Sequence, residues 1–169
     1  MLDINLLVQY KAWANDLTFA ALNALAPGEA TKQRPTRFGS MLHTLNHVYV
    51  IDAIFKAHLL GEAHGYTARN TPEHPPLDEL WEAQAAMDRW YIDYTRSTTD
   101  AQLAELVEFA FVDGGQGCMS RLEMLMHVVN HGTYHRGFVG DLMYQVPAML
   151  PANDLPVFLR ERTRVAADV

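Results

Sequence analysis

The sequence predicts an all-α fold, a four-helix bundle with a short irregular or β-like crossover segment before the last helix. Four long segments repeat apolar side chains every three or four positions, and runs rich in proline, glycine and polar residues separate them. Residues 104–118 instead alternate apolar with small or polar positions and contain a glycine-rich turn. We expect residues 1–169 to form one bundle domain, because this length is typical of a single core.

The first helix is expected over residues 3–25, where one apolar stripe precedes the helix-ending pair Pro27-Gly28. That stripe consists of Leu6, Tyr10, Trp13, Leu17, Ala20 and Ala24. The second helix is expected to begin after Ser40, whose hydroxyl suits an N-cap, and to end at Gly61. Its apolar side holds Leu45, Val48, Ile51, Phe55 and Leu59. A loop over residues 63–76, with three prolines, follows it.

The third helix is expected over residues 77–98, directly after two prolines. Alternating apolar residues near Phe109 then indicate a short strand, and the run 113–117 indicates a turn. The last long helix is expected over residues 120–145, and the tail after Asp154 is expected to hold one short helix. Four helices and one crossover element are most simply packed as a bundle.

Composition and charge are those of an ordinary globular protein. Lysine and arginine total 13 and aspartate and glutamate 20, which gives a net charge of −7. This charge disfavours binding to nucleic acid or to an anionic membrane surface, and no segment is apolar for long enough to span a bilayer. The single cysteine, Cys118, allows no internal disulfide. We therefore expect a cytoplasmic protein that binds neither nucleic acid nor membrane.

The eight histidines are unevenly distributed. Six fall on two of the expected helices, namely His43, His47, His58, His127, His131 and His135. Two imidazoles four residues apart lie on one helical face and can converge on one metal ion. Because His127 and His135 are about 12 Å apart along the helix axis, one ion can bind at most two of His127, His131 and His135.

Helical phase selects three of these histidines as facing inward. At about 100° per residue, His131 and His135 share an arc with apolar side chains, while His127 lies at its edge. The apolar members of that arc are Met124, Val128, Phe138 and Leu142. On the second helix, His47 shares the phase of the apolar residues near Ile51. Burying unpaired imidazoles costs about 1–3 kcal/mol each, which favours a metal site at His47, His131 and His135 over hydrogen-bonded core histidines.

The residues around this metal site are less clearly assigned by sequence. Each ligating imidazole needs an acceptor for its second ring nitrogen, and four polar side chains are near in sequence. They are Asn46, Asp52, Glu123 and Asp141, and for the acids a solvated helix face is the expected setting. Arg136 points about 100° away from His135 and is expected to form a salt bridge within the protein.

The string His127-Val-Val-Asn-His131-Gly-Thr-Tyr-His135-Arg136-Gly137, with Met41-Leu-His-Thr-Leu-Asn-His47 upstream, resembles the DinB family of metalloenzymes. The resemblance covers nearly the whole chain. In that family the second-helix histidine and the two histidines before Arg-Gly bind a divalent metal, which corresponds to His47, His131 and His135. Many members read H-R-G-Q, whereas this chain has Phe138 in the last place, and this departure bears on the pocket rather than on the ligands.

The resemblance implies a divalent-metal-dependent enzyme, a thiol S-transferase that acts on small electrophiles. The family resembles transferases and isomerases that use bacillithiol, mycothiol or glutathione, so the expected cofactors are a divalent ion (Zn, Ni, Fe or Mn) and a low-molecular-weight thiol cosubstrate. A metal-dependent hydrolase and a non-catalytic bundle with a structural metal are the alternatives. We further expect a small-molecule substrate, a homodimer, and release of the metal below about pH 6, where imidazole takes up a proton.

Overall fold

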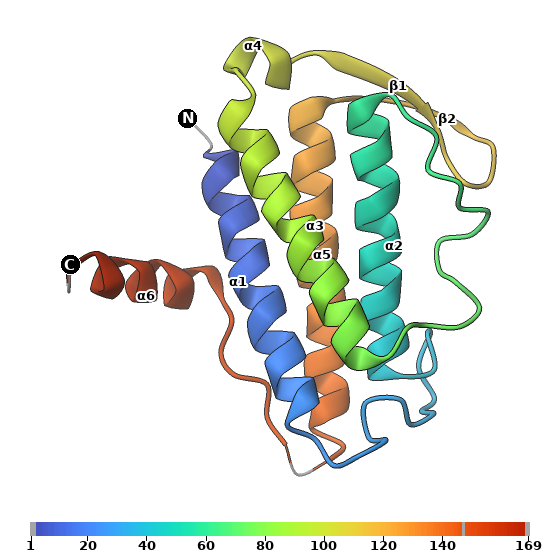
Figure 1. Ribbon diagram of the computed structural model, residues 1–169, viewed down its shortest axis with the longest axis vertical. Coiled ribbons are helices and arrows are strands. Elements are labelled where there is room, and N and C mark those ends of the chain that lie inside the picture. The colour runs from blue at the N-terminus through green and yellow to red at the C-terminus, as the bar shows by residue number, and fades with distance from the viewer. Residues whose placement is uncertain (1–2, 147, 168–169) are drawn as a thin grey trace.

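The computed structural model describes residues 3–146 and 148–167, and four long helices lie side by side in it (Figure 1). They are α1 (Ile4–Asn23), α2 (Met41–Leu60), α3 (Leu77–Ser97) and α5 (Arg121–Met143). α1 packs mainly against α3 and α5, and α2 packs mainly against α5. The predicted fold class is confirmed.

The neighbouring helices α2 and α3 run in the same direction, and this sets the path of the segment that joins them. α1 and α5 descend in the view of Figure 1, whereas α2 and α3 both ascend. A tight turn cannot join two parallel helices, so residues 61–76 return along the outside of the bundle (Figure 1). This return loop leaves the end of α2 and passes back beside that helix.

The capping residues set the helix ends where the sequence indicates them. The carboxylate of Asp3 accepts a hydrogen bond from the backbone N–H of Leu6 at 3.0 Å, and the hydroxyl of Ser40 caps α2. Gly61 ends α2 with a φ of 70°, a left-handed conformation that glycine adopts without strain. Ser120 and Glu123 form a reciprocal capping box at the start of α5.

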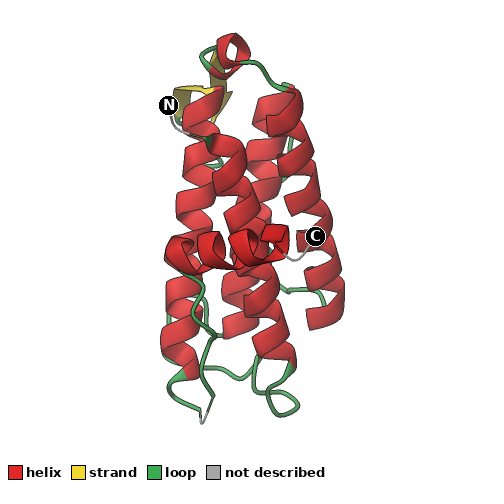
Figure 2. Cartoon of the chain, turned by 90° about the vertical axis from the view of Figure 1, so that its left-hand side faces the viewer, coloured by secondary structure: helices red, strands yellow, loops and turns green. Residues whose placement is uncertain are grey.

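The crossover segment before α5 is a β-hairpin. Strand β1 (Leu106–Ala110) pairs antiparallel with β2 (Gln116–Ser120). The short helix α4 (Asp100–Leu103), which the sequence analysis does not predict, connects α3 to this hairpin. The final helix α6 (Leu155–Ala167) lies across the bundle rather than along it (Figure 2).

The apolar stripe predicted for α1 faces α6 instead of the bundle core. Tyr10 and Trp13 pack against Phe158 of α6, and the indole N–H of Trp13 donates to Glu161 at 3.1 Å. The distal end of the stripe, Ala20 and Ala24, is exposed. The predicted helix is present, and its core face lies beside this stripe and includes polar residues that interrupt the apolar pattern. Those core-facing positions include Lys11, Asn15 and Thr18.

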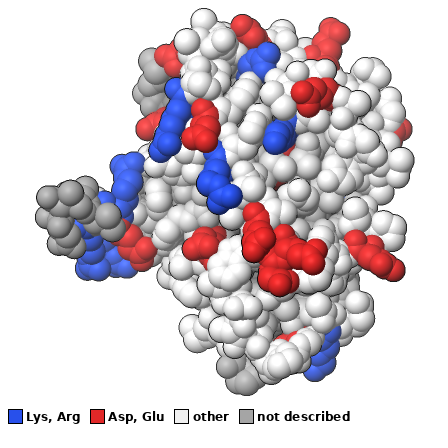
Figure 3. Space-filling view, viewed as in Figure 1, with Lys and Arg blue, Asp and Glu red and all other residues white. Residues whose placement is uncertain are grey.

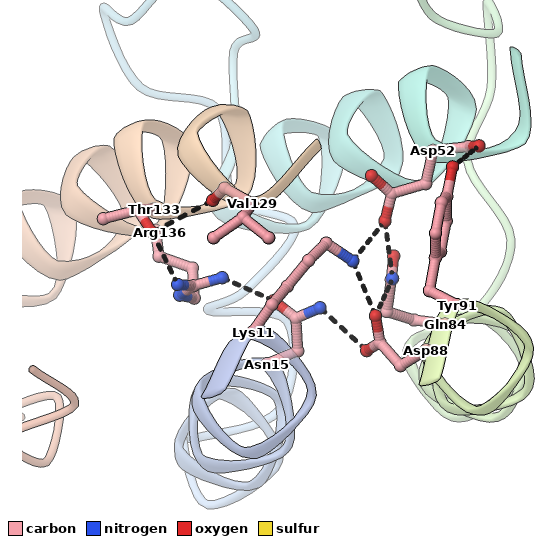
Figure 4. Close-up of polar contacts among 9 residues, drawn as sticks. All are labelled: Lys11, Asn15, Asp52, Gln84, Asp88, Tyr91, Val129, Thr133 and Arg136. Carbon is pink, nitrogen blue, oxygen red and sulfur yellow. Dashed lines mark hydrogen bonds and ion pairs between the residues drawn. The ribbon is translucent and has the colours of Figure 1, made fainter. Parts of the chain in front are cut away.

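The polar residues of α1 join a buried ion-pair network in the centre of the bundle (Figure 4). The ammonium of Lys11, which is 0% exposed, lies 2.6 Å from a carboxylate oxygen of Asp52 and 2.6 Å from one of Asp88. Gln84 donates to the same two carboxylates, and Asn15 donates to Asp88. The network ties α1, α2 and α3 together where a core normally has apolar contacts alone.

Surface charge is mixed on the face shown in Figure 3, where acidic and basic side chains both occur and basic ones gather on α6. The arginines of α6 are Arg160, Arg162 and Arg164. Within the described part of the chain, no helix combines the length and the apolar character that crossing a membrane requires.

Candidate metal centre

Three imidazoles from α2 and α5 meet in the structure. The ring nitrogens that His47, His131 and His135 offer all lie within 4.8 Å of one another. Nε2 of His131 is 3.1 Å from Nε2 of His47, and the three ring centroids are 4.4–4.9 Å apart in pairs. His47 and His135 are buried, and His131 is half-buried. The structure thus brings together the three histidines that helical phase selects.

The ring of His47 is held by the return loop. Its Nδ1 lies 2.6 Å from the backbone carbonyl of Arg69, so Nδ1 carries the proton and donates it. The lone pair of Nε2 is thereby left to face His131. Phe38 stacks on the other side of the His47 ring, with centroids 4.4 Å apart, and fixes its plane.

Asn46 anchors the same loop next to His47. Its side-chain amide donates to Oδ1 of Asn70 and to the hydroxyl of Thr71, the latter at 2.7 Å. Asn70 in turn donates to the backbone carbonyl of His43 at 3.1 Å. The role of Asn46 is therefore to position the loop that supplies the carbonyl, and sequence reasoning left this role unassigned.

The surroundings of the cluster keep its imidazoles neutral. Burial, together with the neighbouring imidazoles of His135 and His47, lowers the pKa of His131 to about 2. Burial, with the nearby charges of His47 and Arg37, lowers the pKa of His135 to about 4. Burial also lowers the pKa of His47, against the opposing effect of its bond to Arg69. Neutral imidazole is the form that binds a metal, so all three are ready to do so at neutral pH.

The donor set and spacing fit a divalent ion. Two nitrogens bound to one tetrahedral zinc at about 2.0–2.1 Å are about 3.3 Å apart, close to the distance between the two Nε2 atoms of His47 and His131. Three imidazole nitrogens without a carboxylate suit zinc, nickel, iron or copper better than magnesium or calcium. Three protein ligands leave at least one coordination position for a small molecule.

The remaining histidines lie outside this cluster. The ring of His127 is 5.4 Å from that of His131 but packs on Phe55, with centroids 4.4 Å apart. His43 is bonded through Nε2 to the carbonyl of Thr71 at 2.9 Å, and His58 packs on Phe109. These positions agree with the helical-phase argument.

The predicted supporting residues are placed differently. Asp52 is not on a solvated face, since it pairs with Lys11 in the core, whereas Glu123 caps α5 and Asp141 is exposed. Within residues 3–146 and 148–167, Nδ1 of His131 and Nδ1 of His135 have no hydrogen-bond partner. The hydrogen-bond acceptor found for a ring nitrogen of the cluster is the backbone carbonyl of Arg69, which bonds His47. Every residue type has such a carbonyl, so the residue types alone do not indicate this acceptor.

Arg136 is buried, as expected of an internal role, but its partners differ from the prediction. Its guanidinium donates to Oδ1 of Asn15 at 2.8 Å and to the hydroxyl of Thr133 at 3.0 Å (Figure 4). Among the described residues it forms no direct salt bridge; Asn15 links it to Asp88. Arg136 therefore belongs to the central network and does not reach the cluster.

A cavity of about 480 Å³ opens beside the three imidazoles. Its walls come from α2, α5, the segment before α2, the return loop and the hairpin. Phe138 lies at this cavity and is 40% exposed, so its predicted core position is wrong. Tyr134, at 63% exposed, also lines it. The volume suits a small molecule that can reach the imidazole cluster.

Comparisons with known proteins agree with this architecture. A model described as the DinB family matches residues 1–164. The chain is 26% identical over 159 residues to Protein DinB of Bacillus subtilis, a match that covers 90% of this chain and 91% of that protein. The fold is similar to the crystal structure of a DinB-like protein from Bacillus cereus, with a TM-score of 0.61 and 17% identity, covering 86% of this chain and 94% of that one.

Proposed function

The chain belongs to the DinB family, and we propose that it is a divalent-metal-dependent enzyme that transfers a thiol to a small electrophile. The observation that carries the proposal is the convergence of three neutral imidazoles beside an accessible cavity. In this proposal His47, His131 and His135 are the metal ligands. A bound divalent ion supplies one chemical property there, the stabilisation of a thiolate at neutral pH.

The proposed transfer is a nucleophilic substitution. The thiol gives its proton to solvent, the sulfur forms a bond to the electrophilic carbon, and the leaving group departs with the electron pair of the bond that breaks. The protein's own side chains orient the reactants. Phe38 and Phe55 provide apolar walls on the α2 side of the cavity, and they limit the access of water to the reacting atoms.

The metal assignment is tested by elemental analysis of protein purified without a histidine tag. We expect about one equivalent of a divalent metal in the natural chain and a large loss in His47→Ala and in His135→Ala, because two imidazoles hold an ion far less tightly than three. His127→Ala is the matched control, since His127 lines the same cavity outside the cluster. A full equivalent retained by both ligand variants contradicts the assignment.

The activity is tested with a panel of thiols, namely glutathione, bacillithiol, mycothiol and cysteine, against chromogenic aryl halides. We expect halide release that needs a thiol and stops when a chelator removes the metal. Ester hydrolysis that needs the metal but no thiol supports the hydrolase instead. A tightly held metal that azide and small thiols cannot reach supports the structural role and contradicts transfer.

A further inference from the structure

The cavity beside the imidazole cluster has an apolar body and a basic edge. Four phenylalanines line it, one from each of four chain segments, and Ile51 and Met119 add further apolar surface. These phenylalanines are Phe38, Phe55, Phe111 and Phe138. Such walls favour a ligand with an aromatic or aliphatic body over a strongly hydrated one, because apolar contact gains free energy when water leaves both surfaces.

The charged side chains of the cavity are all basic. Arg37 and Arg69 line it, and no aspartate or glutamate is among its lining residues in the part of the chain that the structure describes. The protein as a whole carries a net charge of −7, so this basic edge runs against the overall charge. A divalent ion on neutral imidazoles adds further positive charge, and a ligand that fills the cavity therefore meets a field that attracts anions.

The two arginines differ in their availability. The guanidinium of Arg69 is paired with the carboxylate of Asp113 at 2.8 Å. Arg37 is exposed and has neither an ion pair nor a side-chain hydrogen bond to any described residue. Its guanidinium lies 5.8 Å from the centroid of the Phe38 ring, and both residues line the cavity. Arg37 thus lines the cavity beside the apolar wall, with its guanidinium donors available.

We propose that this cavity binds a small carboxylate with an apolar or aromatic body, and that Arg37 binds its carboxylate group. The planar guanidinium matches a carboxylate with two parallel hydrogen bonds, while the phenylalanines cover the body of the ligand. The inference rests on the proposed function in one respect, because it identifies the electrophilic reactant of the transfer as this carboxylate. The binding itself requires no turnover.

The test measures binding directly, by fluorine NMR titration with three probes of one shape. They are para-fluorophenylacetate, its neutral amide, and the cationic para-fluorophenethylamine. We expect the carboxylate to bind most tightly and the amine most weakly. Arg37→Gln is expected to weaken carboxylate binding by about tenfold or more, the usual effect of losing a charged hydrogen-bond partner, and to leave amide binding unchanged. Arg96→Gln, which removes an exposed arginine of α3 outside the cavity, is the matched control and is expected to change binding less than twofold.

Each titration is repeated in the presence of a chelator, so that a direct bond between carboxylate and metal cannot imitate the effect of Arg37. Carboxylate binding that survives chelation and depends on Arg37 supports the inference, even when no thiol transfer is found. Carboxylate binding that is lost on chelation and is unchanged in Arg37→Gln overturns the inference. That result leaves the proposed metal-dependent function unaffected. Equal affinity for the three probes, or no binding of any, overturns it as well.

Discussion

Replacing Lys11 by methionine is expected to destabilise the protein strongly. Methionine fills a similar length but leaves the carboxylates of Asp52 and Asp88 buried without their cation, and these side chains are only 0% and 6% exposed. Breaking a buried ion pair by removing one partner costs about 3–5 kcal/mol. The unfolding entropy is about 2.1 cal/mol/K per residue, so this loss of free energy lowers the melting temperature of the 169-residue chain by about 8–14 °C.

The assay is thermal unfolding followed by circular dichroism, together with urea titration for the free energy. Lys32→Met is the matched control, because Lys32 is 64% exposed and pairs with Glu29 at 3.7 Å, a geometry worth at most about 1 kcal/mol. The triple variant Lys11→Met/Asp52→Asn/Asp88→Asn is expected to recover much of the loss, since it leaves no buried carboxylate without its cation.

The loss in Lys11→Met is also expected to depend on pH. Burial raises the pKa of Asp52 and the ammonium of Lys11 opposes that rise, so removing the ammonium raises it further. A folded-state pKa above the unfolded value means that the folded protein holds its proton more tightly. The variant is therefore stabilised at low pH and loses that stability as pH rises, and its deficit is smaller at pH 5 than at pH 8. A deficit below about 1 kcal/mol, or one that is equal at both pH values, refutes the reasoning.

Three further predictions concern the metal centre and its support. Burial lowers the pKa values of the two α5 imidazoles to about 2 and about 4, which revises the release below about pH 6 expected from an unperturbed imidazole: the proposed metal should stay bound on dialysis at pH 5.5, and its loss at that pH contradicts this. Asn46→Ala should weaken zinc binding about tenfold by loosening the return loop, whereas Asn130→Ala, at the exposed asparagine that precedes His131 as Asn46 precedes His47, should not. Gly137→Ala, with nothing within 4 Å of the new Cβ, should stabilise α5 by about 1 kcal/mol in urea titration, whereas Gly132→Ala should be less stable than Gly137→Ala, because its Cβ meets the buried guanidinium of Arg136 at 3.1 Å and this contact offsets the gain in helix propensity.

Helix ends and the inward-facing histidines could be predicted because they depend on local rules. Ser40 and Gly61 bound α2 through capping chemistry that is visible in the residue types. His131 and His135 share a helical face whatever the rest of the chain does. Spacing within one helix therefore identifies which side chains lie together on a face, although it placed the exposed Phe138 in the core.

The buried network could not be predicted in the same way. Lysine and aspartate are usually found on the solvated surface of a protein. Lys11, Asp52 and Asp88 are tolerated in the core only because the ammonium of Lys11 pairs with both carboxylates. Their partnership joins residues far apart in the chain, so no single-helix pattern contains it. Lys11, together with Asn15 and Thr18, also interrupts the apolar pattern on the core face of α1.

The orientation of His47 shows how chain topology contributes to the site. A tight turn between α2 and α3 would make those helices antiparallel, but the structure has them parallel, and this requires the long return over residues 61–76 (Figure 1). That return brings the carbonyl of Arg69 to Nδ1 of His47 and so directs the lone pair of Nε2 towards His131. A backbone carbonyl is available from every residue type, so what selects Arg69 is the path of the loop and its anchors on Asn46. The tautomer that leaves Nε2 of His47 free for the proposed metal thus depends on the path of the return loop, and shortening this loop should weaken metal binding without changing any of the three imidazoles.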